Sequence, residues 1–326
     1  MRHTMIAMAA MLGLAADAVA QGSDAVQIAP ASQARTPSSD DPDAPIHVAF
    51  DEDRYERMTV PVTIGGKGPY RFFVDTGAQA TVVTSRITED LNIEPRGKAT
   101  LVAMGSSQVV DMIDIDGLEF ADRTLSGLRS PLLQRQHIGA DGILGLDTLQ
   151  DMRVLIDFEN DSMSVADADQ LGGNYGFEIV VRARARLGQM IITDARIDNV
   201  RTAVIIDTGA QNSIGNAALL ARLRARARDS FKFLDVNGVP VESELSYARK
   251  LQIGKLELNQ VPIGFHDSPA FEALGLKDKP ALILGMRNLR LFNRVAIDFA
   301  SRKVLFDVPR DVRTGQERWL RGQGKS

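Results

Sequence analysis

The sequence predicts a mostly β protein of two homologous lobes with a few short helices. One observation is the pentapeptide Asp-Thr-Gly-Ala-Gln, which occurs at both 75–79 and 207–211, each time after an apolar run typical of a buried strand. Two further motifs, Ile-Leu-Gly at 143–145 and 283–285 and Arg-Val-x-Ile-Asp-Phe at 153–158 and 294–299, also occur once in each half. Such internal self-similarity indicates two copies of one structural unit.

The repeats keep a nearly constant spacing along the chain. The offset is 132 residues from Asp75 to Asp207 and 141 residues from Asp157 to Asp298. A drift of nine residues is expected when loops are inserted into diverged halves. The total length of 326 residues also suits two domains of roughly 100–200 residues each.

The N-terminal residues 1–20 are predicted to be a secretory signal peptide. An apolar stretch of the length of a signal core, Met5–Ala16, precedes the small-x-small cleavage site Ala18-Val19-Ala20. The stretch is short for a transmembrane helix and no later apolar run is long enough to span, so no integral membrane span is expected after signal removal. An uncleaved membrane anchor is the alternative. We therefore expect an exported protein, periplasmic rather than secreted or membrane-tethered.

Residues 21–45 are predicted to be a disordered linker, because they are rich in Ser, Pro, Ala and Asp and lack apolar periodicity. A pro-segment is the alternative, although Arg35 is the only basic residue there that is available to pair with carboxylates. At the other end of the chain, the polar tail 311–326 is expected to pack loosely or fray.

The first lobe is predicted to span 46–168 and to consist mainly of short strands. Alternating apolar residues and a glycine-rich turn support this prediction. The expected elements are strands at 58–64 and 70–74 around a turn at 65–69, a helix at 82–91, a helical turn at 147–152 and closing strands at 154–158 and 163–166.

An interlobe linker at 169–175 leads to the second lobe, which is predicted to span 176–310. Alternating arginines at 182–186 are expected on a strand with one solvated face, and those at 222–228 on an exposed helix. The other expected elements are strands at 191–198 and 201–206, a helix at 217–227, a helical turn at 287–291 and closing strands at 295–299 and 303–308.

The composition excludes several classes of function. A net charge of −4 is too small for a dedicated nucleic-acid binder, so no nucleic acid is expected as a partner. The chain has no cysteine, which excludes disulfides, thiolate metal sites and cysteine nucleophiles. Its four histidines show no ligand spacing, so neither a metal site nor a cofactor is expected.

The two repeated loops have the chemistry of a hydrolytic site. An aspartate at the end of a buried strand is costly unless it is hydrogen-bonded or used. The glycine two residues later permits a tight turn, and the threonine between them supplies a hydroxyl that donates and accepts. A pseudo-two-fold axis would bring Asp75 and Asp207 within a few ångströms of each other. Because two carboxyl groups so close together cannot both ionise, the pair would share one proton, and the two groups would act as acid and base.

On these motifs the chain resembles a bacterial retropepsin-like aspartic protease in a single-chain, two-lobed form, related to retroviral and pepsin-type aspartyl proteases. The resemblance covers about residues 46–310. It implies two retropepsin- or pepsin-like β lobes with an active-site cleft between them. It also implies a monomer that hydrolyses the peptide bonds of a polypeptide substrate with a water molecule activated between two carboxylates, without a cofactor.

The resemblance assigns roles to individual residues. It implies that Asp75 and Asp207 are catalytic and that Thr76 and Thr208 make hydroxyl contacts between the loops. The remaining loop residues are implied to support the catalytic pair: Gly77, Ala78, Gly209 and Ala210. Two neighbouring strands are implied to buttress the loops through Ile143, Leu144, Gly145, Ile283, Leu284 and Gly285.

Two departures from the pepsin-type pattern stand out. Ala78 and Ala210 occupy positions that often carry Ser or Thr, whose hydroxyl would favour the ionised carboxylate. We therefore expect activity at mildly acidic to near-neutral pH. Substrate-covering hairpins are expected near 102–108 and 235–241, and neither contains the tyrosine typical of pepsin-like enzymes.

Two alternatives stay open at this point. One is that Asp75 and Asp207 are structural turn residues. The other is that the chain is a non-catalytic peptide-binding or scaffold protein on a protease-derived fold. Asp141, Asp157 and Asp298 also lie beside apolar strands but lack the glycine turn. We expect these three to be structural.

Overall fold

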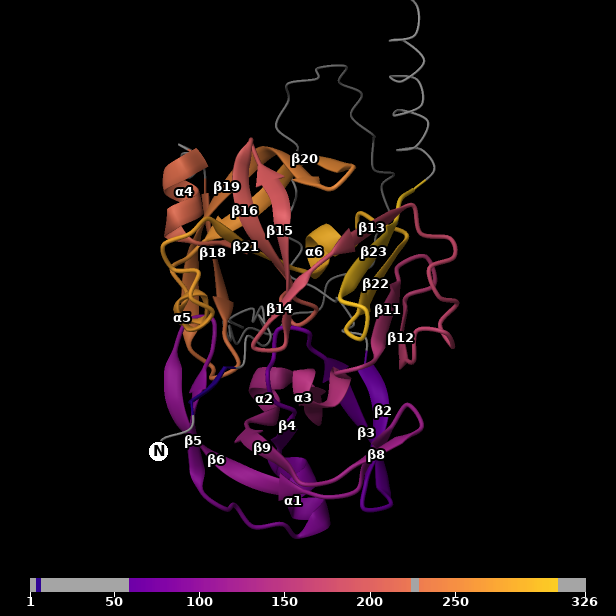
Figure 1. Ribbon diagram of the computed structural model, residues 1–326. Helices are drawn as coiled ribbons and strands as arrows, with labels where there is room; N and C mark the ends of the chain where they lie inside the picture. Colours follow the sequence, from indigo (N-terminus) through magenta and orange to yellow (C-terminus); the bar gives the residue numbers. More distant parts are fainter. Residues whose placement is uncertain (1–3, 7–58, 224–228, 310–326) are drawn as a thin grey trace, which may run out of the picture.

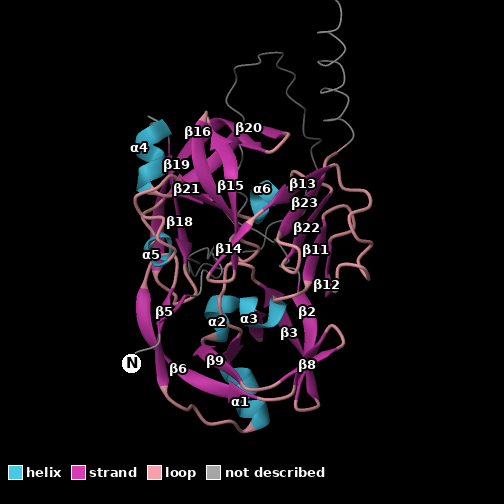
Figure 2. Ribbon diagram, in the orientation of Figure 1, coloured by secondary structure: helices cyan, strands magenta, loops and turns pink. Residues whose placement is uncertain are grey.

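Three β-sheets make up most of the structure, a computed structural model that describes residues 4–6, 59–223 and 229–309 (Figure 1). A ten-stranded sheet belongs to the first half of the sequence and an eight-stranded sheet to the second. The third sheet has five strands and takes them from both halves. Helices are few and short (Figure 2). The predicted mostly β fold with two lobes is confirmed.

The first lobe has the strand order β1-β5-β6-β9-β4-β10-β3-β2-β7-β8. Its strands are β1 (Thr4–Ile6), β2 (Thr59–Ile64), β3 (Lys67–Val74), β4 (Val82–Thr84), β5 (Lys98–Val102), β6 (Ser107–Ile115), β7 (Leu118–Phe120), β8 (Arg123–Leu125), β9 (Leu128–Leu133) and β10 (Gly142–Leu144). Its helices are α1 (Ser85–Leu91), α2 (Arg135–Ile138) and α3 (Leu146–Leu149).

The second lobe has the strand order β14-β15-β16-β21-β17-β20-β19-β18. Its strands are β14 (Arg184–Arg186), β15 (Gln189–Ile197), β16 (Val200–Ile206), β17 (Ile214–Gly215), β18 (Asp229–Leu234), β19 (Pro240–Ile253), β20 (Leu256–Phe265) and β21 (Ala281–Leu284). Its helices are α4 (Ala217–Leu223), α5 (Pro269–Ala273) and α6 (Met286–Leu289). Strands β3 and β16 are equivalent, because each pairs antiparallel with the strand before it and parallel with an apolar strand far along the chain.

The closing strands of the two lobes join each other in the third sheet, which the sequence analysis did not anticipate. Strand β11 (Arg153–Asp157) pairs antiparallel with β22 (Arg294–Asp298). The sheet is completed by β12 (Ser162–Ala166), β23 (Lys303–Asp307) and β13 (Ile179–Arg182). The repeated Arg-Val-x-Ile-Asp motif thus pairs with its own copy, the arginine of each opposite the aspartate of the other. Because its strands come from both halves of the chain, this sheet connects the two lobes along one side (Figure 1).

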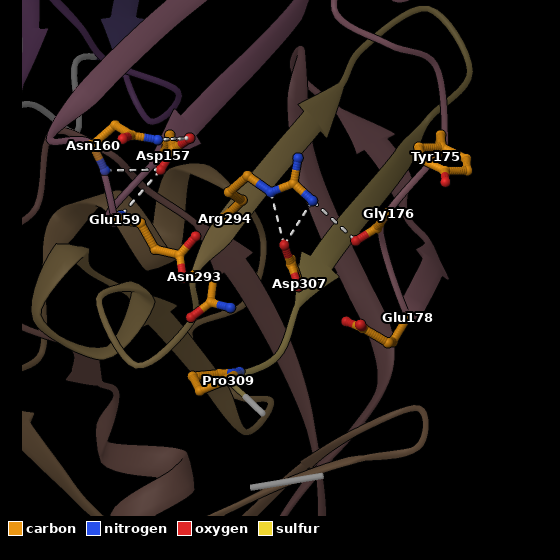
Figure 3. Close-up of a pocket in the computed structure, with 10 residues that line it drawn as sticks. All are labelled: Asp157, Glu159, Asn160, Tyr175, Gly176, Glu178, Asn293, Arg294, Asp307 and Pro309. Carbon is orange, nitrogen blue, oxygen red and sulfur yellow. Dashed lines mark hydrogen bonds and ion pairs between the residues drawn. The ribbon is translucent and has the colours of Figure 1, made fainter. Parts of the chain in front are cut away.

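The two ends of the β11–β22 pair differ in the hydrogen bonds that their Arg and Asp side chains make. At one end Arg153 Nη2 donates to Asp298 Oδ2 at 2.6 Å, and both side chains are buried. At the other end Arg294 Nε donates to Asp307 Oδ2 at 2.7 Å, while Asp157 Oδ1 accepts from the backbone amides of a turn. A pocket of about 1050 Å³ opens there (Figure 3). It shares no residue with either Asp-Thr-Gly loop.

Most predicted elements lie within two residues of their observed bounds, but the helix predicted at 82–91 is partly wrong. Its first three residues form β4, which pairs with β10 and β9. Val82 and Val83 are buried and β-branched, so they suit a pleated sheet better than a helix. Helix α1 begins at Ser85 and ends before Asn92, whose φ of 53° is the left-handed conformation that asparagine tolerates.

The predicted arginine-rich strand is two short strands, β13 and β14, interrupted at Ala183. Arg182, Arg184 and Arg186 are all exposed, as expected for a solvated face. The predicted helix at 217–227 is described as far as Leu223, and residues 224–228 lie outside the described part.

Several predictions concern residues outside the described part of the chain. The linker 21–45, the tail 311–326 and all of the predicted signal peptide except 4–6 belong to this group. Residues 4–6 form β1, which runs parallel to β5. Within the described ranges, no helix is both long and apolar enough to cross a membrane.

Candidate active site

Each Asp-Thr-Gly loop follows a central strand and is held by the apolar strand beside it. β3 leads into Asp75, and β10 lies parallel to it with Leu144 opposite Val74. β16 leads into Asp207, and β21 lies parallel to it with Leu284 opposite Ile206. The backbone amide of each aspartate donates to the facing leucine carbonyl, at 3.0 Å for Asp75 and 3.1 Å for Asp207.

The buttressing strands hold the far side of each loop as well. Leu146 N donates to Ala78 O at 2.8 Å, and Met286 N donates to Ala210 O at 2.8 Å. Gly145 and Gly285, which precede these residues, lie so close to the loop backbone that no side chain would fit. The apolar-apolar-Gly motif therefore places its glycine where the two segments meet.

A second pair of hydroxyls, which the motifs did not predict, holds the loops against the buttressing strands. Gly145 N donates to Thr81 Oγ1 at 3.1 Å, and Gly285 N donates to Ser213 Oγ at 3.0 Å. Thr81 and Ser213 each lie six residues after their aspartate, so the 132-residue repeat extends to them. The signal was present in the sequence as a hydroxyl-bearing residue at the same position of both copies.

The two loops interlock through Thr76 and Thr208. Thr76 Oγ1 donates to Ile206 O at 2.9 Å and accepts from Thr208 N at 3.1 Å. Thr208 Oγ1 donates to Val74 O at 2.7 Å and accepts from Thr76 N at 3.1 Å. Each hydroxyl thus satisfies one donor and one acceptor of the opposite lobe, and the two loops are held face to face.

The carboxylates of Asp75 and Asp207 are held in equivalent ways. Asp75 Oδ1 accepts from the amides of Gly77 at 2.8 Å and Ala78 at 3.0 Å. Asp207 Oδ1 accepts from the amides of Gly209 at 2.9 Å and Ala210 at 3.1 Å. These bonds fix one oxygen of each carboxylate on its own loop. The structure therefore brings together all the loop and buttress residues that the resemblance singled out.

The electrostatic setting of the pair favours one retained proton. Asp75 is 1% exposed and Asp207 is 0% exposed. Burial raises the pKa of Asp207 well above its ordinary value, and the adjacent carboxylate of Asp75 raises it further. The amides of Gly209 and Ala210 oppose this shift without cancelling it. The pair can therefore hold a neutral carboxyl beside a charged one.

A glutamine that the sequence analysis did not single out also reaches the first loop. Gln189, at the start of β15 in the second lobe, donates from Nε2 to Gly77 O at 2.7 Å and is fully buried. No motif marks this residue in the sequence. It adds a contact between the lobes at the glycine of the Asp75 loop.

The three other aspartates make structural contacts. Asp141 accepts from Arg71 N, Arg86 and Arg135. Although burial raises the pKa of this carboxyl, these bonds hold it below the ordinary value. Asp157 and Asp298 accept from turn amides or from Arg153 as described above. Among the described residues, no group of three or more His, Cys, Asp or Glu side chains is placed to hold a metal ion.

Both predicted hairpins are present at the expected positions. The first joins β5 to β6 through residues 103–106, and the second joins β18 to β19 through residues 235–239. Their tips contact each other, which the sequence did not predict.

Both Asp-Thr-Gly loops lie in segments that match a known protein family. A family model described as aspartyl protease matches residues 60–148 and 193–287, one segment in each lobe and together more than half of the chain. Each segment contains one Asp-Thr-Gly loop and its buttressing strand. No curated protein sequence is significantly similar to the chain.

Several solved structures resemble it at low sequence identity. One is a retropepsin-like aspartic protease from Rickettsia conorii, at 20% identity over 39% of this chain and 88% of that chain, with a TM-score of 0.28. Another is edgp, at 11% identity over 77% of this chain and 94% of that chain, with a TM-score of 0.33. A third is basic 7S globulin from soybean, at 12% identity over 76% of this chain and 95% of that chain, with a TM-score of 0.34.

Proposed function

The chain belongs to the aspartyl protease family, and from that premise we propose that it is an aspartic endopeptidase whose catalytic pair is Asp75 and Asp207. The observation that carries this proposal is the reciprocal bonding of Thr76 and Thr208, which fixes the two aspartate loops face to face. Turn aspartates with a purely structural role would not need this arrangement in both lobes at once.

The proposed reaction uses the two carboxyls as base and acid. The ionised carboxylate removes a proton from a water molecule held between Asp75 and Asp207, and the water oxygen attacks the carbonyl carbon of the scissile peptide bond. The neutral carboxyl donates its proton to the carbonyl oxygen, which gives a gem-diol. The carbon–nitrogen bond then breaks as one carboxyl protonates the leaving amine while the other carboxylate takes the proton of a gem-diol hydroxyl, so the product carboxylic acid is released and the pair is left with one proton.

The proposed reaction determines which subunits, cofactors and substrate the protein is expected to need. Both carboxylates come from one chain, so a monomer is sufficient for activity. The acid and the base are both supplied by the pair, so the proposed reaction requires neither a metal nor a cofactor. The substrate is a polypeptide that lies in a cleft between the lobes.

We also propose that the substrate is an exported or periplasmic protein. The support lies in residues 1–20, whose apolar core and small-x-small site are those of a secretory signal. Mass spectrometry of the mature N-terminus tests this part of the proposal. A chain that begins at residue 21 supports export with cleavage. A chain that retains residues 1–20 in the membrane of a secreting host supports the uncleaved anchor, and one that retains them in the cytoplasm contradicts export.

The catalytic proposal is tested with Asp75→Asn and Asp207→Asn against a peptide library. Both variants are expected to lose cleavage while they unfold at nearly the wild-type temperature. Asp157→Asn is the matched control, because Asp157 also follows an apolar strand but lies outside both loops. It is expected to cleave at the wild-type rate. A wild-type protein that binds library peptides and cleaves none would instead support the peptide-binding alternative.

A further inference from the structure

The β14–β15 hairpin of the second lobe reaches the Asp75 loop of the first lobe. At the tip of this hairpin, Leu187 O accepts from Gln79 Nε2 at 3.1 Å. Gln189, which follows the two-residue turn, donates from Nε2 to Gly77 O at 2.7 Å. Strand β14 accordingly lies at the boundary between the lobes (Figure 1). The hairpin is therefore placed directly beside one loop of the aspartate pair.

Arg184 and Arg186 project from the same face of this hairpin as Gln189. In the antiparallel register Arg186 lies opposite Gln189, and Arg184 lies opposite Ile191. Residues paired in this way share one face of the sheet and have Cβ atoms about 5 Å apart. The base of the Arg186 side chain is thus close to a residue that bonds a loop of the aspartate pair. Its guanidinium extends to Gly275, just beyond α5, where it leaves no room for a Cβ.

The positive charge along this part of the chain is not neutralised by the protein itself. Arg184 and Arg186 are exposed, and neither side chain has an ion-pair or hydrogen-bond partner within the described ranges. Arg182, on β13, is also exposed and lies opposite Lys303 of β23. Like charges directly opposite each other on neighbouring strands destabilise a sheet. This surface is therefore suited to an anionic partner.

The spacing of Arg184 and Arg186 matches that of an extended polypeptide. They are two residues apart on a strand, so their side chains emerge about 7 Å apart on one face. Every second side chain of an extended substrate has the same spacing and the same direction. Carboxylates at two alternate positions of such a substrate could each meet one guanidinium, which can donate two parallel hydrogen bonds to a carboxylate.

We propose that Arg184 and Arg186 determine substrate specificity, by binding Asp or Glu side chains at two alternate positions on one side of the scissile bond. The inference rests on the proposed function, since it names the substrate class for that site. The preference is confined to one side because the two halves differ here. The first-half residues 132 positions earlier are Glu52 and Arg54, which carry opposite charges.

The contribution of each arginine is expected to be modest and sensitive to salt. Exposed ion pairs of this kind change a binding constant by about two- to fivefold, and salt screens them. The contact is remote from the reacting atoms and is the same before and during the reaction. Its loss should therefore raise KM and leave kcat unchanged.

Three substitutions and a matched control test the inference. Arg184→Gln and Arg186→Gln each remove one charge from an exposed side chain. Arg186→Glu reverses the charge. Arg196→Gln is the control, because Arg196 is exposed on the far end of β15, on the order of 20 Å from Gln189.

Binding is measured first, without cleavage, in the Asp75→Asn background. The probe is a fluorescein-labelled library peptide synthesised with Asp, Asn or Lys at each position in turn, and fluorescence anisotropy gives its Kd. Asp is expected to bind about two- to fivefold tighter than Asn at two alternate positions. One preference should disappear in Arg184→Gln and the other in Arg186→Gln, while both persist in Arg196→Gln. Arg186→Glu should prefer Lys at its position.

Kinetics of the enzyme with both catalytic aspartates give the second readout. KM for the same unlabelled peptides should follow the Kd values, and kcat should not change. Thermal unfolding of each variant should match that of the wild type, since the substituted side chains are exposed.

The outcomes separate this inference from the protease proposal. Equal binding of the Asp, Asn and Lys peptides at every position overturns the inference and leaves the proposed function intact. An equal loss in Arg196→Gln also overturns it, because the effect would then follow net charge alone. So does arginine-dependent binding to vesicles of anionic lipid with no charge preference among peptides. A preference that Arg186→Gln abolishes, in a protein that cleaves no peptide, supports the inference and contradicts only the proposed catalysis.

Discussion

Gly77 of the first lobe lies directly against the carboxylate of Asp207 in the second. A Cβ on Gly77 would lie 2.5 Å from Asp207 Oδ2, and Gly209 has the same relationship to the carboxylate of Asp75. The glycine of each loop therefore serves the aspartate of the opposite loop. This reciprocity explains why a turn residue without a side chain is present in both copies of the motif.

Gly77→Ala is expected to reduce kcat strongly. The added methyl group pushes the two loops apart, and a displacement of about 1 Å from reacting geometry costs on the order of 100-fold in rate. Peptide cleavage and thermal unfolding are measured side by side. A variant that keeps the wild-type kcat would show that the loops need not approach this closely.

Thr76→Ala is expected to destabilise the fold as well as to lower activity. It leaves the buried Ile206 carbonyl and Thr208 amide without their partner, which costs about 1–3 kcal/mol in the free energy of unfolding for each unsatisfied group. Thr76→Ser keeps the hydroxyl and serves as the control. Urea unfolding checks the prediction, and equal midpoints for Thr76→Ala and Thr76→Ser would contradict it.

Ala210→Ser is expected to move the alkaline limb of the pH–rate profile to lower pH. Because burial and Asp75 raise the pKa of Asp207, the shared proton is retained to a higher pH than an ordinary aspartate allows. Activity is therefore lost as the pH rises through that raised pKa. A serine hydroxyl that donates to Asp207 stabilises the charged form and lowers this pKa. A wild-type optimum well below about pH 3, where an ordinary aspartate is protonated, would contradict the account.

Asp298→Asn is expected to destabilise the sheet between the lobes. The substitution leaves Arg153 as a buried charge without its carboxylate, which costs about 3–5 kcal/mol. Burial raises the pKa of Asp298, but bonds from Ser301 and Arg153 more than offset this and lower it. The carboxylate thus contributes stability above its unfolded pKa, and that contribution is lost as the pH falls through the folded pKa.

Denaturant unfolding at several pH values checks this prediction. The difference between wild type and Asp298→Asn should be greatest near neutral pH and should shrink below about pH 3.9, the ordinary pKa of aspartate. Asp157, at the equivalent position of the other repeat, is half-buried and accepts from turn amides, so Asp157→Asn should change stability by less than about 1 kcal/mol. Equal losses for the two variants would contradict the assignment of a buried ion pair.

The parts of the fold that repeat could be predicted from the sequence, because both copies obey the same constraints. Asp75 and Asp207 lie at the ends of predicted strands, and the leucines of the buttress motifs face the strands that lead into them. Thr81 and Ser213 were missed because they differ in identity, although both present a hydroxyl to a buttress glycine. The two halves therefore share hydrogen-bonding groups at positions where their residues are not identical.

Several contacts between the lobes could not be predicted. Gln189 bonds Gly77 from a strand that carries no motif, and Ser106 meets Asp235 only because both lobes close on each other. The shared sheet likewise depends on β11 and β22 meeting across more than a hundred residues. Local pattern carries no information on pairings of this kind, which are decided by the packing of the lobes.

The most direct test of the central claim is cleavage by Asp75→Asn and Asp207→Asn, assayed separately and as an equimolar mixture. The claim is that both carboxylates of one chain form one site. Each variant alone and the mixture should then be inactive, since no chain in the mixture carries both aspartates. Wild-type cleavage by either single variant would contradict the role of that aspartate, and recovered activity in the mixture would show that the site forms between two chains.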